Sequence, residues 1–269
     1  MEFTAHNIDL GNGKTTMDGK LIAETQECKG IIRSLNLVFR PSERSVTRVA
    51  DLGCLEGGYT VEIAREGYQV TGFEARTSSF NNCEFVRQQI GLPNLSFIQE
   101  DVKNLEKYGK FDAILCHGLL YHLDSPSSFL EMISGLCNKV LILDTHYSLE
   151  NDMLYDFLPF LNPYKRIVTK RLPALSRKHN YALSGLAEHE GRKGRWFKEY
   201  RKKASKEEIE ASKWAAFSNH RAFWPTKKDL LQSLKDYHFS IIYQQFDNLE
   251  DLRSDYVERY DRGLFVCHK

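Results

Sequence analysis

The sequence predicts an α/β fold in which a mostly parallel sheet carries helices on both faces. Between residues 46 and 146, short apolar stretches alternate with segments of helical periodicity. The apolar stretches are continuous, which is typical of strands buried on both faces. Ligands of such sheets bind beyond the carboxyl ends of the strands. Four polar residues fall at predicted strand ends, namely Glu74, Asp101, His117 and His146.

Length and composition limit the class of protein. At 269 residues, the chain is long enough for one large α/β domain with an insertion. Its hydrophobic fraction of 42% is ordinary for a globular protein, and its formal net charge of +1 identifies no partner. We expect no membrane contact, because no apolar run approaches the ~20 residues of a membrane span and residues 1–6 lack a signal-peptide pattern. The six cysteines form no C-x-x-C pair, so we expect reduced thiols and a cytoplasmic protein.

Changes in sequence pattern divide the chain into four parts. These are an N-terminal arm (1–45), a core (46–146), an insertion (147–224) and the resumed core (225–269). In the arm, Gly11-Asn12-Gly13-Lys14 predicts a hairpin turn, and Ala23–Phe39 predicts a helix that ends before Pro41. Two roles remain open for the arm: a packing segment, or a lid over a bound ligand.

The core begins with strand Arg48–Leu52, the turn Asp51-Leu52-Gly53-Cys54-Leu55-Glu56-Gly57-Gly58 and a helix at Tyr59–Glu66. This order of strand, glycine-rich turn and helix surrounds a ligand with backbone N–H groups and a helix N-terminus. Gly53 and Gly57 lack a Cβ, so the main chain can turn sharply and approach the ligand. Leu55 stands where a dinucleotide fingerprint has its middle glycine, which favours a cofactor without a pyrophosphate.

Strands and helices continue to alternate through the rest of the core. The predicted elements are strand Gln69–Glu74, helix Thr77–Ile90, strand Leu95–Gln99, strand Phe111–Cys116, helix Ser127–Leu136 and strand Lys139–Asp144. Because Glu74 ends the second strand, its carboxylate is placed to accept both hydroxyls of a ribose.

The insertion is far longer than the ~2–6 residues of a usual α/β connection. Its stretch from Lys165 to Lys203 is strongly basic, and Ser205–Phe217 reads as a helix. The core then resumes. Its predicted elements are helix Lys227–Lys235, strand Phe239–Gln244, an acidic loop at 247–261 and strand Gly263–Cys267.

Three motifs resemble those of the class I S-adenosylmethionine-dependent methyltransferases. They are the turn Asp51–Gly58, the acid Glu74, and the stretch GLLYHLDSP at 118–126. The arm's HNIDLGNGKTT, at 6–16, looks like the segment ahead of the core in the tRNA wobble-uridine methyltransferase group. The resemblance implies a Rossmann-like, seven-stranded, mostly parallel sheet closed by an antiparallel strand pair, with S-adenosylmethionine as the cofactor.

The resemblance also implies a set of cofactor-binding residues. They are Asp51, Gly53, Cys54, Leu55, Gly57, Glu74, Ala75, Asp101, Val102, Cys116 and His117. In the family, an acid at the position of Asp101 contacts the adenine amino group. The alternative is that Asp101 only caps the turn Val102–Leu105, because Asp is a common cap.

Methyl transfer is an in-line displacement at a sulfonium carbon, and a hydroxyl acceptor must also lose its proton. His117 follows the fourth strand, and the reference imidazole pKa of ~6.5 suits a base near neutral pH. His122 and His146 are the other candidates. Each of the three histidines could instead have a structural role. We expect no metal: His117, Asp144 and His146 could converge, but no metal-binding spacing is present.

The acceptor side is the least determined part. We expect substrate contacts from Tyr121, His146, Asn219, Arg221 and Trp224, although Phe223 and Trp224 could merely pin the insertion to the sheet. The basic stretch could clamp an anionic small molecule, follow an RNA backbone or remain solvated. Because no RNA-binding module is evident, we predict O-methylation of a small anionic metabolite, sugar or nucleotide-linked acceptor. A tRNA methyltransferase is the alternative. A non-catalytic binding module is the least supported class, and the oligomeric state stays open.

Overall fold

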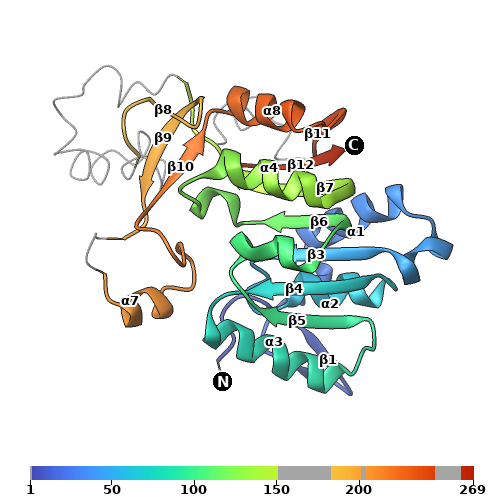
Figure 1. Ribbon diagram of the computed structural model, residues 1–269. Coiled ribbons are helices and arrows are strands. Elements are labelled where there is room, and N and C mark those ends of the chain that lie inside the picture. The colour runs from blue at the N-terminus through green and yellow to red at the C-terminus, as the bar shows by residue number, and fades with distance from the viewer. Residues whose placement is uncertain (1, 151–182, 201–203, 246–261) are drawn as a thin grey trace.

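A seven-stranded sheet forms the centre of the computed structural model, which describes residues 2–150, 183–200, 204–245 and 262–269 (Figure 1). The strand order is β11-β12-β7-β6-β3-β4-β5. Five strands are parallel: β3 (Arg48–Leu52), β4 (Gln69–Glu74), β5 (Leu95–Gln99), β6 (Phe111–His117) and β7 (Cys137–His146). The last two, β11 (Ile241–Gln245) and β12 (Arg262–His268), form an antiparallel pair at one edge. The predicted α/β fold and its closing strand pair are confirmed.

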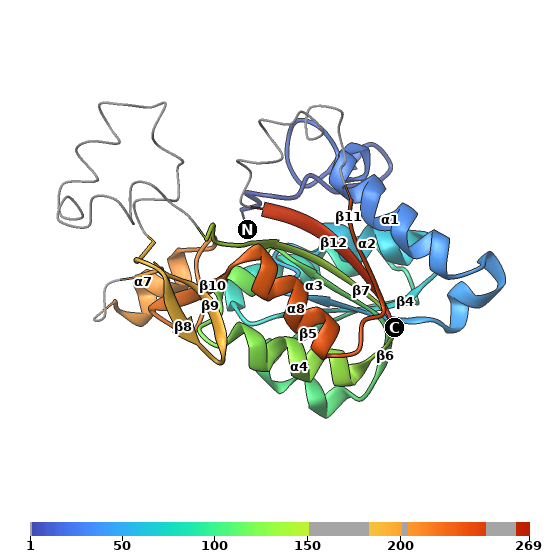
Figure 2. The ribbon, with the colours of Figure 1, turned by 90° about the horizontal axis from the view of Figure 1, so that it is seen from above.

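Helices cover both faces of this sheet (Figure 2). On one face lie α1 (Gln26–Val38), α2 (Gly58–Arg65) and α3 (Thr77–Ile90); on the other lie α4 (Pro126–Leu136) and α8 (Lys227–Asp236). Each face has its own apolar cluster, because side chains of successive strand residues point to opposite faces. In β6, Ala113 and Leu115 join the first cluster, whereas Ile114 and Cys116 join the second.

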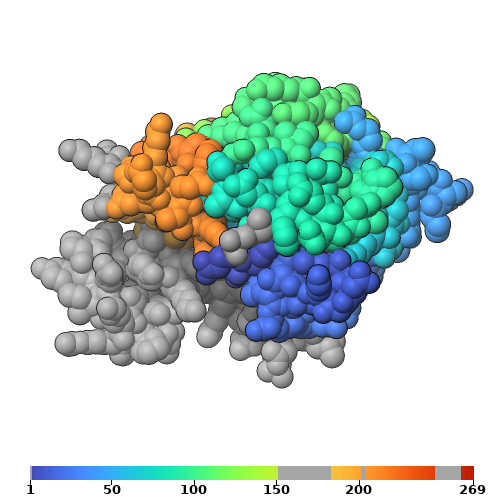
Figure 3. All heavy atoms as spheres, turned by 90° about the horizontal axis from the view of Figure 1, so that it is seen from below, coloured from blue at the N-terminus to red at the C-terminus, as the bar shows by residue number. Residues whose placement is uncertain are grey.

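The arm packs along the first face. Its strands β1 (Asp9–Gly11) and β2 (Lys14–Thr15) form the predicted hairpin, and the 3₁₀ helices η1 (Ile22–Glu24) and η2 (Pro41–Val46) flank α1. At the start of the arm, the carbonyl oxygen of Glu2 accepts hydrogen bonds from Asn82 and Lys213. Figure 3 shows this dark-blue start between the orange part of the insertion and the teal helix α3.

The described part of the insertion forms a second sheet. Its strands β8 (Ala187–His189), β9 (Arg192–Lys198) and β10 (Arg221–Pro225) are antiparallel in the order β10-β9-β8. The helix predicted at Ser205–Phe217 is shorter in the structure, where α7 spans only Lys206–Ala211 and Ser212 is its C-cap. The Arg76 guanidinium donates to the carbonyl oxygens of Ala215 and Ala216 instead, so a tertiary contact overrides local helix propensity.

Some predictions remain untested by the structure. The boundaries of the four parts stay predictions. The acidic loop at 247–261 lies outside the described residues, as does much of the basic stretch, at 165–182 and 201–203. In the described residues, no helix is long and apolar enough to cross a membrane.

Candidate functional site

A cavity of about 370 Å³ opens at the carboxyl ends of the parallel strands. Core residues from the ends of β3, β4 and β6 line its floor. Three other segments contribute to the wall: Ala5, His6 and Ile22 of the arm, residues 213–219 of the insertion, and Arg262 of the resumed core. The cavity therefore lies where all four parts of the sequence meet.

The glycine-rich turn after β3 forms the centre of this floor. Gly53 has a φ of +68°, and a Cβ there would lie 3.2 Å from Cδ1 of Leu119. Gly57 has a φ of +80°, and a Cβ there would lie 2.6 Å from Cζ of Phe97. Both positions thus require glycine, as predicted, but only Gly53 lines the cavity.

Glu74 is held rigidly beside this turn. Its Oε2 accepts a hydrogen bond from the backbone nitrogen of Leu55 at 2.9 Å, and its Oε1 accepts one from that of Arg76 at 2.8 Å. Burial raises the pKa of Glu74, while the hydrogen bonds from Arg76 and Leu55 oppose the rise. The carboxylate is thereby fixed at the cavity edge.

Asp51 lies deeper, behind the turn. The hydroxyl of Thr60 donates to its Oδ2 at 2.6 Å, which ties β3 to α2. Burial raises the pKa of Asp51 to about 7; the Thr60 hydrogen bond lowers it and the nearby Glu74 raises it further. Asp51 lines the cavity floor as a residue close to its protonation midpoint at neutral pH.

Asp101 caps a 3₁₀ helix at the border of the cavity. Its Oδ1 accepts a hydrogen bond from the backbone nitrogen of Lys103 at 3.0 Å, so it caps the 3₁₀ helix η3 (Val102–Tyr108). It also lines the cavity, together with Val102. The capping interaction leaves the second carboxylate oxygen available, and the adenine contact stays a prediction.

His117 lies beside the ion pair of Asp144 and Arg262 at one end of the cavity. Its Nε2 lies 3.7 Å from Oδ2 of Asp144, which is too long for a hydrogen bond. Asp144 instead forms a bidentate ion pair with Arg262, whose Nε lies 3.0 and 3.1 Å from the two carboxylate oxygens. Burial lowers the pKa of His117, although Asp144 partly offsets it, so the ring is neutral at pH 7.

His122 makes a shorter contact. Its Nδ1 lies 2.8 Å from Oε1 of Glu199, whose side chain is 2% exposed. The second oxygen of Glu199 accepts from the backbone nitrogen of Ala216, and Asn219 donates to the carbonyl oxygen of His122. The insertion therefore delivers a buried carboxylate to a histidine on the cavity wall.

Several predicted residues lie elsewhere. His146 stacks on Trp224 at a ring distance of 4.8 Å and does not line the cavity. Trp224 donates from its indole nitrogen to the carbonyl oxygen of Tyr121, so it fastens β10 to the wall. Arg221 covers the ring of Trp196. Cys116 lies in the apolar cluster under α4, on the face of the sheet opposite to that of its neighbour Leu115.

Other residues of the wall were not predicted from sequence. These are chiefly His6, Tyr59, Arg76, Lys213 and Arg262. His6 lies in the arm stretch that resembles the wobble-uridine group, which was the one available signal. For Arg262 and Lys213 no local pattern exists, because tertiary packing alone brings them to the cavity. In the ranges that the structure describes, no three His, Cys, Asp or Glu residues are grouped as a metal site.

Together, the sheet, the glycine-rich turn, Glu74 and the cavity define a class I S-adenosylmethionine-dependent methyltransferase. The sequence profile of a family described as "Methyltransferase domain" matches residues 43–204, more than half of the chain. The chain belongs to this family and is an enzyme whose cofactor is S-adenosylmethionine.

Curated relatives include two kinds of enzyme. A tRNA U34 carboxymethyltransferase of Campylobacter fetus is 32% identical over 108 residues, which cover 39% of this chain and 38% of the relative. A ubiquinone biosynthesis O-methyltransferase of Paracidovorax citrulli is 30% identical over 91 residues, which cover 33% and 38%. The chain thus matches less than two fifths of the length of either relative.

Solved structures extend the likeness over nearly the whole fold. The N-terminal domain of EvdMO1, crystallised with SAH and D-fucose, has a TM-score of 0.63 at 19% identity and covers 97% of this chain and 89% of its own. The magnesium protoporphyrin IX methyltransferase ChlM of Synechocystis PCC 6803, with bound SAH, has a TM-score of 0.55 at 16% identity and covers 94% and 90%. At such identities the likeness establishes the fold.

Proposed function

We propose that this methyltransferase O-methylates a small anionic acceptor, with a cavity histidine as general base. The observation that carries the proposal is the contact between His122 and the buried Glu199 on the cavity wall. A hydroxyl acceptor must lose its proton, and a base oriented by a carboxylate can take it, whereas an amine that arrives deprotonated needs no base. The similarity to ubiquinone biosynthesis O-methyltransferases supports the same acceptor atom.

The cavity fits the cofactor. Gly53 lines the cavity and has no side chain, so a ligand can approach its main chain closely. We assign Glu74 to the ribose hydroxyls, Asp101 and Val102 to the adenine, and the turn residues 53–55 to the rest of the cofactor. When bound, S-adenosylmethionine supplies a methyl group on a positively charged sulfur, which makes the thioether a good leaving group.

For the base, the geometry favours His122 over His117, which the sequence ranked first. If Nδ1 of His122 carries the proton donated to Glu199, the lone pair of Nε2 remains to take the acceptor's proton. No described residue pairs with that nitrogen. His117 has no such orienting bond, since its distance to Asp144 is 3.7 Å. His146, away from the cavity, is assigned a packing role.

The arm, the core and the insertion all border the same cavity, and such an enclosed site supports a small acceptor. The basic residues between 165 and 203 support a negative charge on it. We propose residues 147–224 as an acceptor-side lid and the arm as a fixed wall. The cytoplasm, where thiols stay reduced, is the proposed location, since all six cysteines are unpaired.

A tRNA acceptor is the second candidate, favoured by the match to tRNA U34 carboxymethyltransferase. An RNA substrate would meet the same basic residues, and its affinity would fall steeply with salt.

An assay with methyl-labelled S-adenosylmethionine separates the two acceptors. Label transfer is measured to phenolic acids, sugar acids and nucleotide sugars, and in parallel to bulk tRNA. We expect label on a hydroxyl of a small acid and none on tRNA. Label on tRNA, with binding that weakens between 50 and 200 mM salt, would replace the small-molecule proposal. Label on nitrogen or carbon would refute O-methylation.

A further inference from the structure

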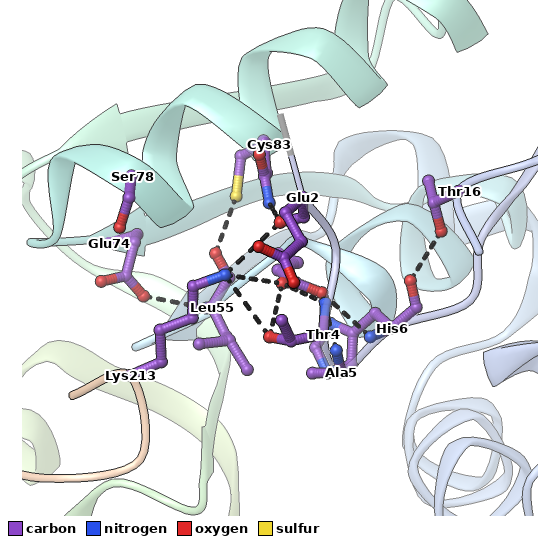
Figure 4. A network of polar contacts seen from close by, with 12 residues as sticks. Glu2, Thr4, Ala5, His6, Thr16, Leu55, Glu74, Ser78, Cys83 and Lys213 are labelled. Carbon is purple, nitrogen blue, oxygen red and sulfur yellow. Dashed lines mark hydrogen bonds and ion pairs between the residues drawn. The ribbon is translucent and has the colours of Figure 1, made fainter. Parts of the chain in front are cut away.

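The arm is fastened to the glycine-rich turn by one carboxylate. Glu56 is fully buried, and its two oxygens accept hydrogen bonds from the backbone nitrogens of Thr4, Ala5 and His6 at 2.9, 3.0 and 3.0 Å. Burial raises the pKa of Glu56, but the three backbone hydrogen bonds outweigh it and the pKa is lowered. The carboxylate is ionised at neutral pH, and Figure 4 shows Thr4, Ala5 and His6 gathered beside Leu55 and Lys213.

This attachment places the His6 ring against the first turn of α2. The backbone nitrogen of Gly58 donates to Nδ1 of His6 at 3.0 Å. Because Nδ1 is an acceptor, the proton of the neutral ring resides on Nε2. Burial lowers the pKa of His6 to about 4, with Glu56 partly opposing and His117 assisting. The ring is therefore a neutral Nε2–H donor throughout the physiological range.

The His6 ring borders the site. The ring lines the cavity beside Tyr59, at a ring distance of 5.3 Å. Among the described residues, none forms a hydrogen bond with Nε2 of His6. This nitrogen is not one of the fully buried atoms without a partner, so it keeps some exposed surface. Within the described part of the chain this donor therefore has no acceptor, on a ring that borders the cavity.

The position of this donor indicates what it binds. Glu74 and Asp101 lie at the ends of β4 and β5, whereas His6 lies near His117, at the end of β6. Gly53 and Leu55 line the floor between them. A nucleoside whose ribose is held by Glu74 would extend its 5′ substituent over the turn toward His6. In the cofactor, that substituent is an amino acid with a carboxylate, which a fixed N–H donor recognises.

We infer that His6 is a cofactor-binding residue whose Nε2–H donates a hydrogen bond to the carboxylate of the amino-acid half of S-adenosylmethionine. This inference rests on the proposed placement of the ribose at Glu74. It gives the arm a binding role, because the binding site is incomplete without residues 4–6. It also explains Gly58, where a Cβ would lie 2.8 Å from the His6 ring.

Two ligands that differ only in the amino-acid half test this assignment. Isothermal titration of the full chain is made with S-adenosylhomocysteine and with 5′-methylthioadenosine, which lacks that half. For His6→Ala, we expect S-adenosylhomocysteine affinity to fall roughly 10- to 100-fold, with methylthioadenosine affinity within about 3-fold of the wild-type value. For His6→Gln, whose amide can still donate, we expect part of the lost affinity to return.

Gly58→Ala is the matched second variant, because it displaces the ring without removing it. We expect the same selective loss there. Equal losses for both ligands would reduce His6 to a packing residue, and unchanged affinities would also overturn the inference. If wild-type protein binds neither ligand, the proposed cofactor site itself fails. In protein labelled with ¹⁵N at histidine, S-adenosylhomocysteine should shift the protonated Nε2 of His6, identified by its absence in His6→Gln.

Discussion

The arm and the insertion border the same cavity, yet the core fastens them with opposite chemistry. On the arm side, the buried carboxylate of Glu56 accepts from three consecutive backbone N–H groups. On the insertion side, the guanidinium of Arg76 donates to the carbonyl oxygens of Ile209, Ala215 and Ala216. Both of these core side chains, which we call tethers, bind main-chain atoms. The arm and the insertion, which we call the two covers of the cavity, differ in the group that each provides. The arm provides the neutral N–H donor of His6, whereas the insertion provides the Glu199 carboxylate that contacts His122.

The largest expected effect concerns the chemistry that the insertion carries. His122→Ala should lower the methyl-transfer rate by about 10²–10⁴-fold, because the proton acceptor is lost. Glu199→Gln should lower kcat with little change in S-adenosylhomocysteine affinity, since it removes only the orienting carboxylate. Rates are measured with the acceptor found in the labelled-methyl assay. His117→Ala is the control, and a greater loss there than in His122→Ala would return the base to His117.

Next in size is the tether of the arm. Glu56→Ala leaves the N–H groups of Thr4, Ala5 and the buried His6 without their charged acceptor, and we expect about 3 kcal/mol less unfolding free energy. Urea denaturation measures this loss, with the exposed Glu106→Ala as control. A loss below 1 kcal/mol would show that the arm contributes little to stability.

The arm should also make the stability of the protein depend on pH through His6. The pKa of His6 is about 4 when folded, against 6.5 ordinarily, so the unfolded chain binds its proton first as the pH falls. The unfolding free energy that depends on the neutral His6 ring is therefore full above about pH 6.5. It decreases toward pH 4 by on the order of 3 kcal/mol. The unfolding free energy of wild type minus that of His6→Gln should show this decrease between pH 7.5 and 4. Comparison with His6→Gln cancels Asp51, whose raised pKa of about 7 acts in the opposite direction.

The smallest effect is expected at the tether of the insertion. Arg76→Ala removes hydrogen bonds to three carbonyl oxygens, of which that of Ala216 is buried, so about 2 kcal/mol of stability should be lost. Limited trypsin digestion at Lys206 or Lys213 should then accelerate. The Glu56→Ala protein should not show this acceleration at Lys206. If it does, the arm and the insertion open together, which would contradict separate attachment of the two segments.

The sequence predicted the core well because its signals are local. Each of its signals can be recognised from a few neighbouring residues: the continuous apolar strands, the turn at 51–58 and the acid Glu74. The three-stranded sheet of the insertion was missed, since β9 pairs with β10 although residues 199–220, which include α7, separate the two strands in the sequence. Glu199 was not selected as a site residue because its partner His122 is 77 positions away. Arg76 determines where α7 ends from outside that helix, which no local periodicity encodes.

Lys213 joins the two covers to each other. Its Nζ lies 3.4 Å from the carbonyl oxygen of Glu2 and 3.5 Å from Oε1 of Glu56. Lys213 therefore links arm, core and insertion beside the proposed cofactor site, and we predict that this link opens when spent cofactor leaves. The Lys213 side chain is 19% exposed, so salt should weaken this link more than it weakens the buried hydrogen bonds of Glu56. We expect cofactor exchange to quicken with ionic strength, and turnover to be limited by departure of the product at low salt.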